Sequence, residues 1–214
     1  WGSNTGTRLS VHFLNYKDPH SDAADILIDE SGKDGRTRVA NPDEYSEFVT
    51  SDLRSQMKFL SLFAIGQAYY AKWDYDTSLA IFRKSLLNVT PSKDINKPLS
   101  IANFYVGYLS QQKVETLEDA VQAYRNAINL NDQYGEAYNN LGVVLHYLGS
   151  LPDAKVYLEN AEKLLPNDSK PFSNLGFLKI ALGDYKGAIE DLDIAVKNNG
   201  DDVIALINRG SAHR

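Results

Sequence analysis

The feature that most constrains this chain of 214 residues is a glycine that recurs at a nearly fixed interval. The recurring glycines are Gly66, Gly107, Gly142, Gly176 and Gly210, so the successive intervals are 41, 35, 34 and 34 positions. Self-similarity at a fixed period of this order is typical of arrays in which each repeat packs only on its neighbours. The two longer intervals indicate insertions, one around "TPSKDINKPLS" and one within Lys113–Thr116.

A small–bulky–small series follows the glycine in each complete interval and predicts a second helix. A small residue stands 12 or 13 positions after the glycine, a bulky one four later, and another small one three after that. The four series are Ser78/Phe82/Ser85, Ala120/Tyr124/Ala127, Ala154/Leu158/Ala161 and Ala188/Leu192/Ala195. Spacings of three and four place side chains on one helical face. We therefore expect each unit to be two closely packed helices, with tight turns at "WDYD", "GSLPD" and "GDYKG".

Together with the late prolines Pro91 and Pro166, these motifs resemble the tetratricopeptide repeat (TPR). The resemblance covers about residues 59–214. It implies an all-α fold, an α-α superhelix in which helix-turn-helix repeats stack as a solenoid. The implied repeats are about 59–92, 100–134, 135–168 and 169–202, with a partial repeat at 203–214. Because the chain stops inside the first helix of that fifth repeat, we expect the natural protein to continue past it.

Residues 1–58 do not fit the repeat. "RLSVHFLNY" alternates and is rich in strand formers, and "DILIDESGKDGRTRVA" has the pattern of a hairpin. "NPDEYSEFVTSDL" predicts a short helix with Asn41 as its N-cap. Two or three strands cannot bury a core alone. We therefore expect residues 1–58 to be a short β-strand and hairpin segment, either the end of a larger upstream domain or a cap on the first repeat.

Composition and motifs favour neither catalysis nor nucleic-acid binding. The formal net charge is −6, and no basic stripe of the kind that phosphate backbones select is present. The absence of cysteine excludes disulfides, thiolate metal sites and cysteine nucleophiles. No HExxH, P-loop or GxSxG motif occurs, so we expect no enzyme, cofactor or metal. His20 lies near Asp18 and Asp22, but one histidine with flexible carboxylates is better interpreted as part of a solvated loop.

The sequence contains no apolar run long enough to cross a membrane, which needs about 18 residues or more, so no membrane-spanning segment is expected. The compartment is left open, with the cytoplasm favoured, since proteins of other compartments can also lack cysteine.

The TPR resemblance implies a concave groove lined by the first helix of each repeat. The implied positions, counted from the glycine, are minus six, minus three, plus one, plus four and plus five, with minus two at the border. The predicted binding residues are Asn139, Asn140, Val143, His146, Tyr147, Lys170, Ser173, Asn174, Phe177, Asn208, Phe104 and Tyr108. The first repeat adds Leu60 and Phe63, for which either a ligand or the N-terminal strands could be the cover.

Asn140, Asn174 and Asn208 occupy the minus-two position of three consecutive units. This row resembles the asparagine ladder of some TPR proteins, whose amides grip the backbone of an extended peptide. An amide both donates and accepts hydrogen bonds, as a peptide group does. The alternative is that these asparagines tie neighbouring helices together, and both roles can hold.

The expected function is a non-catalytic protein–protein interaction scaffold that binds an extended peptide or partner segment in the groove. We expect it to be one module of a larger bacterial multidomain protein. The first alternative is a structural or self-association module, a homo-oligomer that uses the uncapped end near Leu206 and Ile207. The second is a regulatory arm of an upstream enzyme or sensor.

Overall fold

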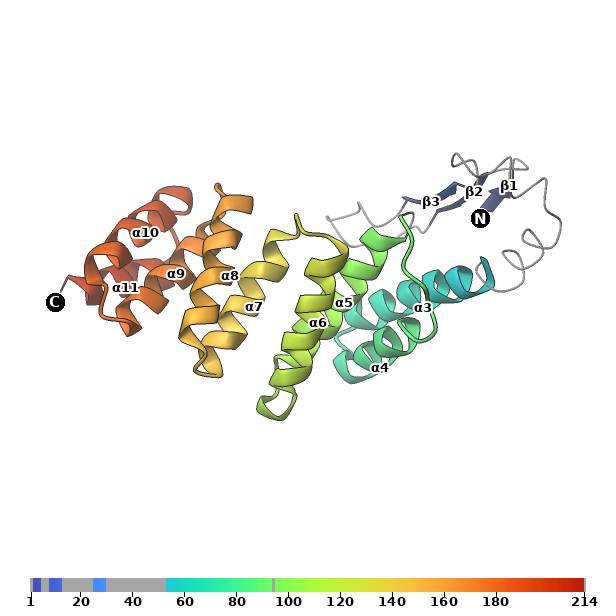
Figure 1. Cartoon of the computed structure of the whole chain (residues 1–214), viewed down its shortest axis with the longest axis horizontal. Helices are drawn as coiled ribbons and strands as arrows, with labels where there is room; N and C mark the ends of the chain where they lie inside the picture. Colours follow the sequence, from blue (N-terminus) through green and yellow to red (C-terminus); the bar gives the residue numbers. More distant parts are fainter. Residues whose placement is uncertain (1, 5–7, 13–24, 30–52, 94, 214) are drawn as a thin grey trace. The chain divides into compact units, whose positions relative to one another are not determined.

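The computed structural model describes residues 2–4, 8–12, 25–29, 53–93 and 95–213. The chain divides into two compact units, Trp1–Leu109 and Ser110–Arg214. Most of the described residues are helical, and Figure 1 labels the elements in chain order.

The unit Trp1–Leu109 begins with three short strands, β1 (Gly2–Asn4), β2 (Arg8–His12) and β3 (Asp25–Asp29). They form an antiparallel sheet in the order β1-β2-β3, in which Leu9 pairs with Ile28. The predicted hairpin turn, its second strand and the helix expected near Asn41 lie outside the described residues. The N-terminal segment as a whole therefore stays a prediction.

Three helices follow in the same unit: α3 (Leu53–Ala71), α4 (Tyr75–Ser85) and α5 (Asn96–Ser110). The predicted boundary after residue 58 falls inside α3, and part of the predicted insertion forms the first turn of α5. The ring of Phe63 packs 5.8 Å from those of both Phe59 and Phe82. This aromatic cluster is the core that joins α3 to α4.

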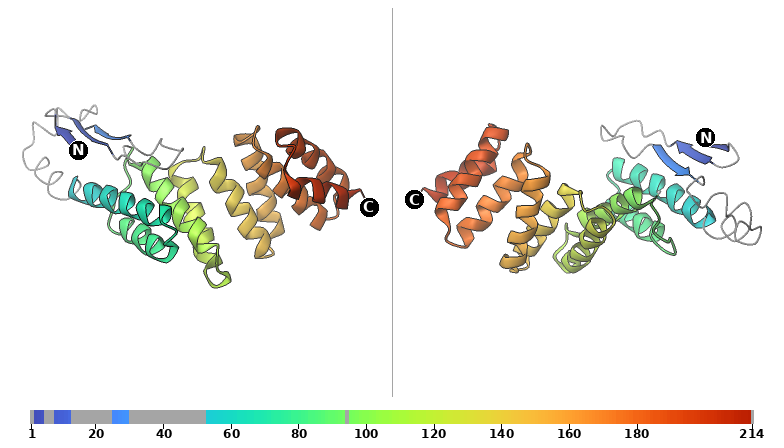
Figure 2. Two further views of the ribbon diagram at one scale, coloured as in Figure 1. Left: turned by 180° about the vertical axis from the view of Figure 1, so that it is seen from behind. Right: turned by 45° about the horizontal axis from the view of Figure 1, so that its top comes forward.

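The unit Ser110–Arg214 consists of a short 3₁₀ turn and six helices. These are η3 (Val114–Thr116), α6 (Leu117–Leu130), α7 (Gly135–Tyr147), α8 (Leu151–Leu164), α9 (Ser169–Ala181), α10 (Tyr185–Asn198) and α11 (Val203–Ala212). Helices α7 to α11 lie side by side in chain order, and each packs on the next, as both views of Figure 2 show. Helices α7, α9 and α11 also pack on one another, α7 on α9 and α9 on α11. The prediction of stacked helical hairpins is confirmed for this unit.

Three of the helical hairpins are closed by turns with the same hydrogen bonds. The amide of the first residue after the turn donates to a carbonyl five positions earlier. The three bonds are Asp74 N to Tyr69 O at 3.1 Å, Ser150 N to Leu145 O at 2.9 Å and Asp184 N to Lys179 O at 2.9 Å. This is the long bond of a Schellman motif, which requires a left-handed residue just before the donor. Gly149 and Gly183 supply that residue with φ of +79° and +78°, and Trp73 supplies it with φ of +65°.

The recurring glycine allows close helix crossing in three hairpins, α3/α4, α7/α8 and α9/α10. A Cβ atom added to Gly142 would lie 2.6 Å from Leu158 Cγ and 3.1 Å from the Ala154 carbonyl oxygen. A Cβ atom added to Gly176, one repeat later, would lie at the same 2.6 Å from Leu192 Cγ. The small–bulky–small series of the sequence is thus the surface against which the glycine packs.

Candidate functional site

Ten of the twelve predicted binding residues lie on the first helices of the hairpins in the unit Ser110–Arg214. Helix α7 carries Asn139, Asn140, Val143, His146 and Tyr147; α9 carries Lys170, Ser173, Asn174 and Phe177; α11 carries Asn208. Asn139 and Ser173 are only 7% and 4% exposed, so they lie within the helix packing. The remaining eight are partly or fully exposed.

A continuous chain of side-chain hydrogen bonds crosses this unit. Asn174 Nδ2 on α9 donates to Asn139 Oδ1 on α7 at 2.8 Å. Asn139 Nδ2 donates to Asn140 Oδ1 at 3.1 Å, and Asn140 Nδ2 donates to the Tyr124 hydroxyl at 3.3 Å. The Tyr124 hydroxyl in turn donates to Gln111 Oε1 at 2.8 Å. The asparagines therefore tie α9 to α7 and α7 to α6.

Tyr124 takes part in this series of hydrogen bonds, although the sequence pattern predicted only a packing role for it. Its ring is fully buried, as the bulky member of the small–bulky–small series should be. The equivalent residues of the other units are Phe82, Leu158 and Leu192, which have no hydroxyl. A buried tyrosine hydroxyl usually has a hydrogen-bond partner. The tyrosine in a position otherwise occupied by Phe or Leu was therefore the sequence feature that could have indicated a polar contact here.

Asn208 does not continue the chain of amides. Its side chain is partly exposed and makes no hydrogen bond to another residue in the part of the chain that the structure describes. The bond between repeats joins Asn174, two positions before its repeat glycine, to Asn139, three positions before the glycine of the preceding repeat. By the same offset, the partner of Asn208 would be Ser173. Because a serine side chain is shorter than an asparagine side chain, the cross-link is not repeated between α9 and α11.

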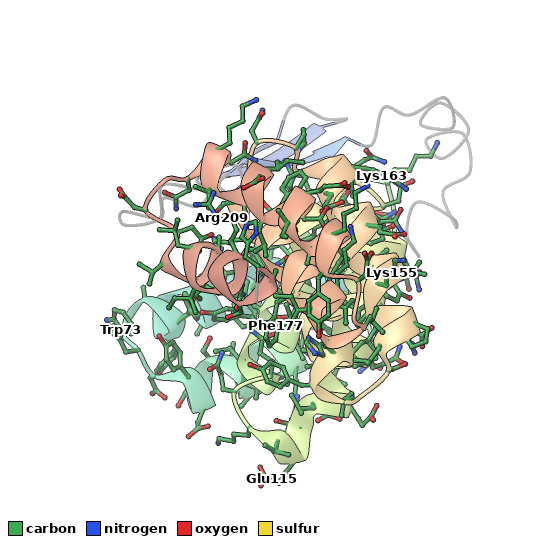
Figure 3. All side chains as sticks on the ribbon, turned by 90° about the vertical axis from the view of Figure 1, so that its left-hand side faces the viewer. Trp73, Glu115, Lys155, Lys163, Phe177 and Arg209 are labelled. Atoms are coloured by element: carbon green, nitrogen blue, oxygen red, sulfur yellow. The ribbon has the colours of Figure 1, made fainter. Side chains whose placement is uncertain are left out.

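Aromatic side chains lie beside the amides on the same two helices. The His146 ring lies 5.1 Å from that of Phe177 and 6.4 Å from that of Tyr147. Phe177 is 49% exposed and Tyr147 is 80% exposed. Figure 3 labels Phe177 on its ribbon. Partial burial lowers the pKa of the His146 imidazole below its ordinary value, so the ring is mostly neutral at pH 7.

Charge is sparse among these residues, because Lys170 is the one cation of the ten. It is exposed in the first turn of α9, where its backbone amide donates to the Asp168 N-cap at 2.9 Å.

A second group of charges lies between α8, α9 and α10. Lys179 Nζ pairs with Asp191 Oδ2 at 2.6 Å, and burial together with the Asp191 charge raises the pKa of Glu162 to about 7.

Phe104 and Tyr108 belong to the other unit, on α5. Their rings are stacked at 6.4 Å, and Tyr70 of α3 lies 6.3 Å from Tyr108. Burial, reinforced by Tyr108 and other neighbouring tyrosines, raises the pKa of Tyr70 to about 12. Leu60 and Phe63, for which a cover was expected, are both buried at 1% exposure. Phe63 fills the core between α3 and α4.

Within the described ranges, no three His, Asp or Glu side chains gather in a way that could hold a metal ion. The predicted loop around His20 lies outside those ranges. No described helix is both long and apolar enough to cross a membrane.

Family models match two parts of the chain. A model described as "TPR repeat" matches residues 115–149, and one described as "Tetratricopeptide repeat" matches residues 175–214. This chain is a tetratricopeptide repeat protein. The two TPR matches include the whole of α6, α7, α10 and α11 and residues 175–181 of α9, and these helices carry the amides and aromatic side chains described above.

Two solved structures share the fold. One is "YrrB: a TPR protein with an unusual peptide-binding site", with 21% identity and a TM-score of 0.61 over 71% of this chain and 74% of YrrB. The other is MamA, with 20% identity and a TM-score of 0.62 over 73% of this chain and 81% of MamA. At these identities the similarity concerns the fold alone.

Among curated proteins, Protein FlbA of Caulobacter vibrioides is 27% identical over 82 residues, or 38% of this chain. The match spans only 14% of FlbA, so this TPR chain corresponds to a small part of that protein.

Proposed function

We propose that the TPR chain is a non-enzymatic scaffold that binds an extended peptide or partner segment on the face formed by α7 and α9. The observation that carries the proposal is the place where amides and exposed aromatic rings meet. Asn140 and Asn174 are partly exposed, and each uses only one of its two N–H groups in the bonds described above. The second N–H of each amide and the Asn174 carbonyl oxygen can therefore pair with a peptide group.

Phe177 and Tyr147 would supply the apolar part of the contact. Aromatic residues are enriched at protein–protein interfaces, where they supply large apolar contact area. Because the surrounding residues are mostly neutral, an uncharged segment loses the least hydration on this face. YrrB, which is described as having an unusual peptide-binding site on a similar fold, is consistent with this proposal.

The test is selection of displayed dodecapeptides against the chain, followed by calorimetry of the best binder. We expect Phe177→Ala to weaken that peptide by about tenfold or more, since a hot-spot truncation costs about 2 kcal/mol. Val156→Ala is the matched control, because Val156 is an exposed apolar residue on α8. If the selected peptides bind the Phe177→Ala protein as tightly as the parent, the proposed face is not the site.

A second candidate function is self-association through α11. Val203, Ile204 and Ile207 are 63%, 66% and 63% exposed, a larger apolar surface than a single helix normally presents to water. Sedimentation velocity over a range of concentrations distinguishes this function. We expect Ile204→Glu and Ile207→Glu to abolish any association, whereas a parent protein that stays monomeric at the highest concentration excludes it.

A further inference from the structure

The turn between α3 and α4 carries a residue that its backbone geometry disfavours. Trp73 has a φ of +65°, in the same Schellman turn where the two later hairpins have Gly149 and Gly183. Left-handed backbone is natural for glycine, whereas a bulky side chain is strained there. The fold therefore favours glycine at position 73 and has tryptophan instead.

Packing does not explain the tryptophan either. Trp73 is 79% exposed, and Figure 3 shows it at the outer edge of the side chains, away from the ribbon. Its ring contacts that of Tyr75 in an edge arrangement, with centroids 6.1 Å apart. Strained residues that contribute little to the core occur most often at functional sites, and tryptophan is enriched among binding hot spots.

The neighbouring residues indicate the kind of partner. Residues 71–76 are all exposed, and Asp74 and Asp76 alternate along the sequence with the aromatic residues Trp73 and Tyr75. Carboxylates beside an indole suit a cation, because the face of tryptophan is the best side-chain surface for a cation–π contact. The same turn already shows such a contact, since Lys72 Nζ lies 5.9 Å from the centre of the Tyr69 ring.

We propose that this turn, defined by Trp73, Asp74, Tyr75 and Asp76, docks a segment of a partner protein through an arginine side chain. The planar guanidinium stacks on the exposed indole, and the adjacent carboxylates balance its charge. The formal net charge of −6 on the chain favours the approach of a basic segment. This surface lies in the unit Trp1–Leu109, so it is independent of the function proposed for α7 and α9.

The probe is the peptide (Arg-Gly-Gly)₃, compared with a peptide in which citrulline replaces arginine. Citrulline keeps the planar shape and removes the charge. Trp1→Phe leaves Trp73 as the sole tryptophan, because the chain has two, so its fluorescence reports the site directly. We expect the arginine peptide to bind about two- to fivefold more tightly, which corresponds to an exposed cation–π contact. Equal affinity for the two peptides overturns the proposal.

Two variants separate docking from folding, with binding followed by anisotropy of a rhodamine-labelled peptide. Trp73→Gly introduces the residue that the two later hairpin turns have at this position and removes the strain of a left-handed tryptophan. Its melting midpoint should therefore be unchanged or higher by up to about 4 °C. It should nevertheless lose the preference for arginine over citrulline. Asp74→Asn keeps the N-cap acceptor that serves Thr77 N and removes the charge, so it should weaken the arginine peptide about twofold.

The matched control is Gly149→Trp in the Trp73→Gly protein, which moves an exposed tryptophan to a turn where Ser150 replaces the flanking aspartate. We expect no arginine preference in this protein. A preference as large as the parent's overturns the proposal, because any exposed tryptophan would then suffice. A Trp73→Gly protein that keeps the parent's preference overturns it as well.

Discussion

Replacing Gly142 by alanine tests whether the recurring glycine is required by the crossing of the paired helices α7 and α8. The new Cβ would lie 2.6 Å from Leu158 Cγ and 3.1 Å from the Ala154 carbonyl oxygen. Leu158 is 1% exposed, so its side chain cannot move aside without disturbing the core. The clash has to be relieved by shifting α8 or by a strained rotamer of the leucine.

Two opposing terms determine the magnitude. Overpacking of a tight core costs about 1–3 kcal/mol. Alanine is favoured over glycine in a helix interior by about 1 kcal/mol. We therefore expect Gly142→Ala to lower the free energy of unfolding by about 0–2 kcal/mol, the difference between the two terms. Because that range includes zero, this variant needs a companion.

Gly210→Ala is the companion that makes the test sharp. Gly210 has the same position in the next repeat but one and is exposed on α11. A Cβ atom added to it would meet no atom of the described residues within 4 Å, its own helix backbone aside. Only the propensity term acts there, so this variant should raise the free energy of unfolding by about 0.5–1 kcal/mol. The difference between the two changes in free energy of unfolding largely cancels the helix-propensity term and leaves the steric cost, about 1–3 kcal/mol.

The assay is urea unfolding followed by circular dichroism, with all variants at one pH and ionic strength. The reasoning is refuted if Gly142→Ala stabilises the protein as much as Gly210→Ala does. A double-mutant cycle gives a second check, because Leu158→Ala removes the atoms that clash. In the Leu158→Ala protein, the cost of Gly142→Ala should fall by most of the steric term.

Three further predictions concern polar groups of the unit Ser110–Arg214. Asn174→Ala leaves Asn139 Oδ1 without its donor, and we expect a loss of about 1–3 kcal/mol in urea unfolding, with Asn174→Ser intermediate. The Glu162 pKa is raised in the folded protein, so stability should fall as pH rises from the ordinary glutamate pKa to about 7. Glu162→Gln should therefore be more stabilising at pH 8 than at pH 5 in the same assay. Lys179→Met leaves Asp191 as a buried unpaired carboxylate and should cost about 3 kcal/mol at pH 8, whereas an unchanged midpoint would show that water screens the pair.

The helical hairpins could be predicted because their determinants lie close together in the sequence. A glycine followed twelve positions later by a small residue defines two helices and their crossing, and "GSLPD" and "GDYKG" contain the left-handed glycines Gly149 and Gly183. The TPR resemblance drawn from these motifs is confirmed. Helix ends were less predictable, since α5 begins inside a segment interpreted as an insertion.

The polar cross-link could not be predicted, because it depends on how one repeat is rotated against the next. Equivalent positions suggested that Asn140 and Asn174 act alike. The structure pairs Asn174 with Asn139 instead, an offset of one position that places different side chains in contact. A repeat period identifies equivalent positions, but it does not determine which unlike positions meet across the interface between two repeats.

Departures from the internal repeat are therefore more informative than the repeat itself. Gly149 and Gly183 show which residue the turn favours, and comparison with them shows that the backbone of Trp73 is unfavourable for its side chain. Tyr124 stands out in the same way, as the one hydroxyl in a position otherwise held by Phe or Leu, and it anchors the amide chain. In both cases the fold would tolerate the repeat's usual residue, so the unusual one points to an interaction beyond the packing of the hairpin.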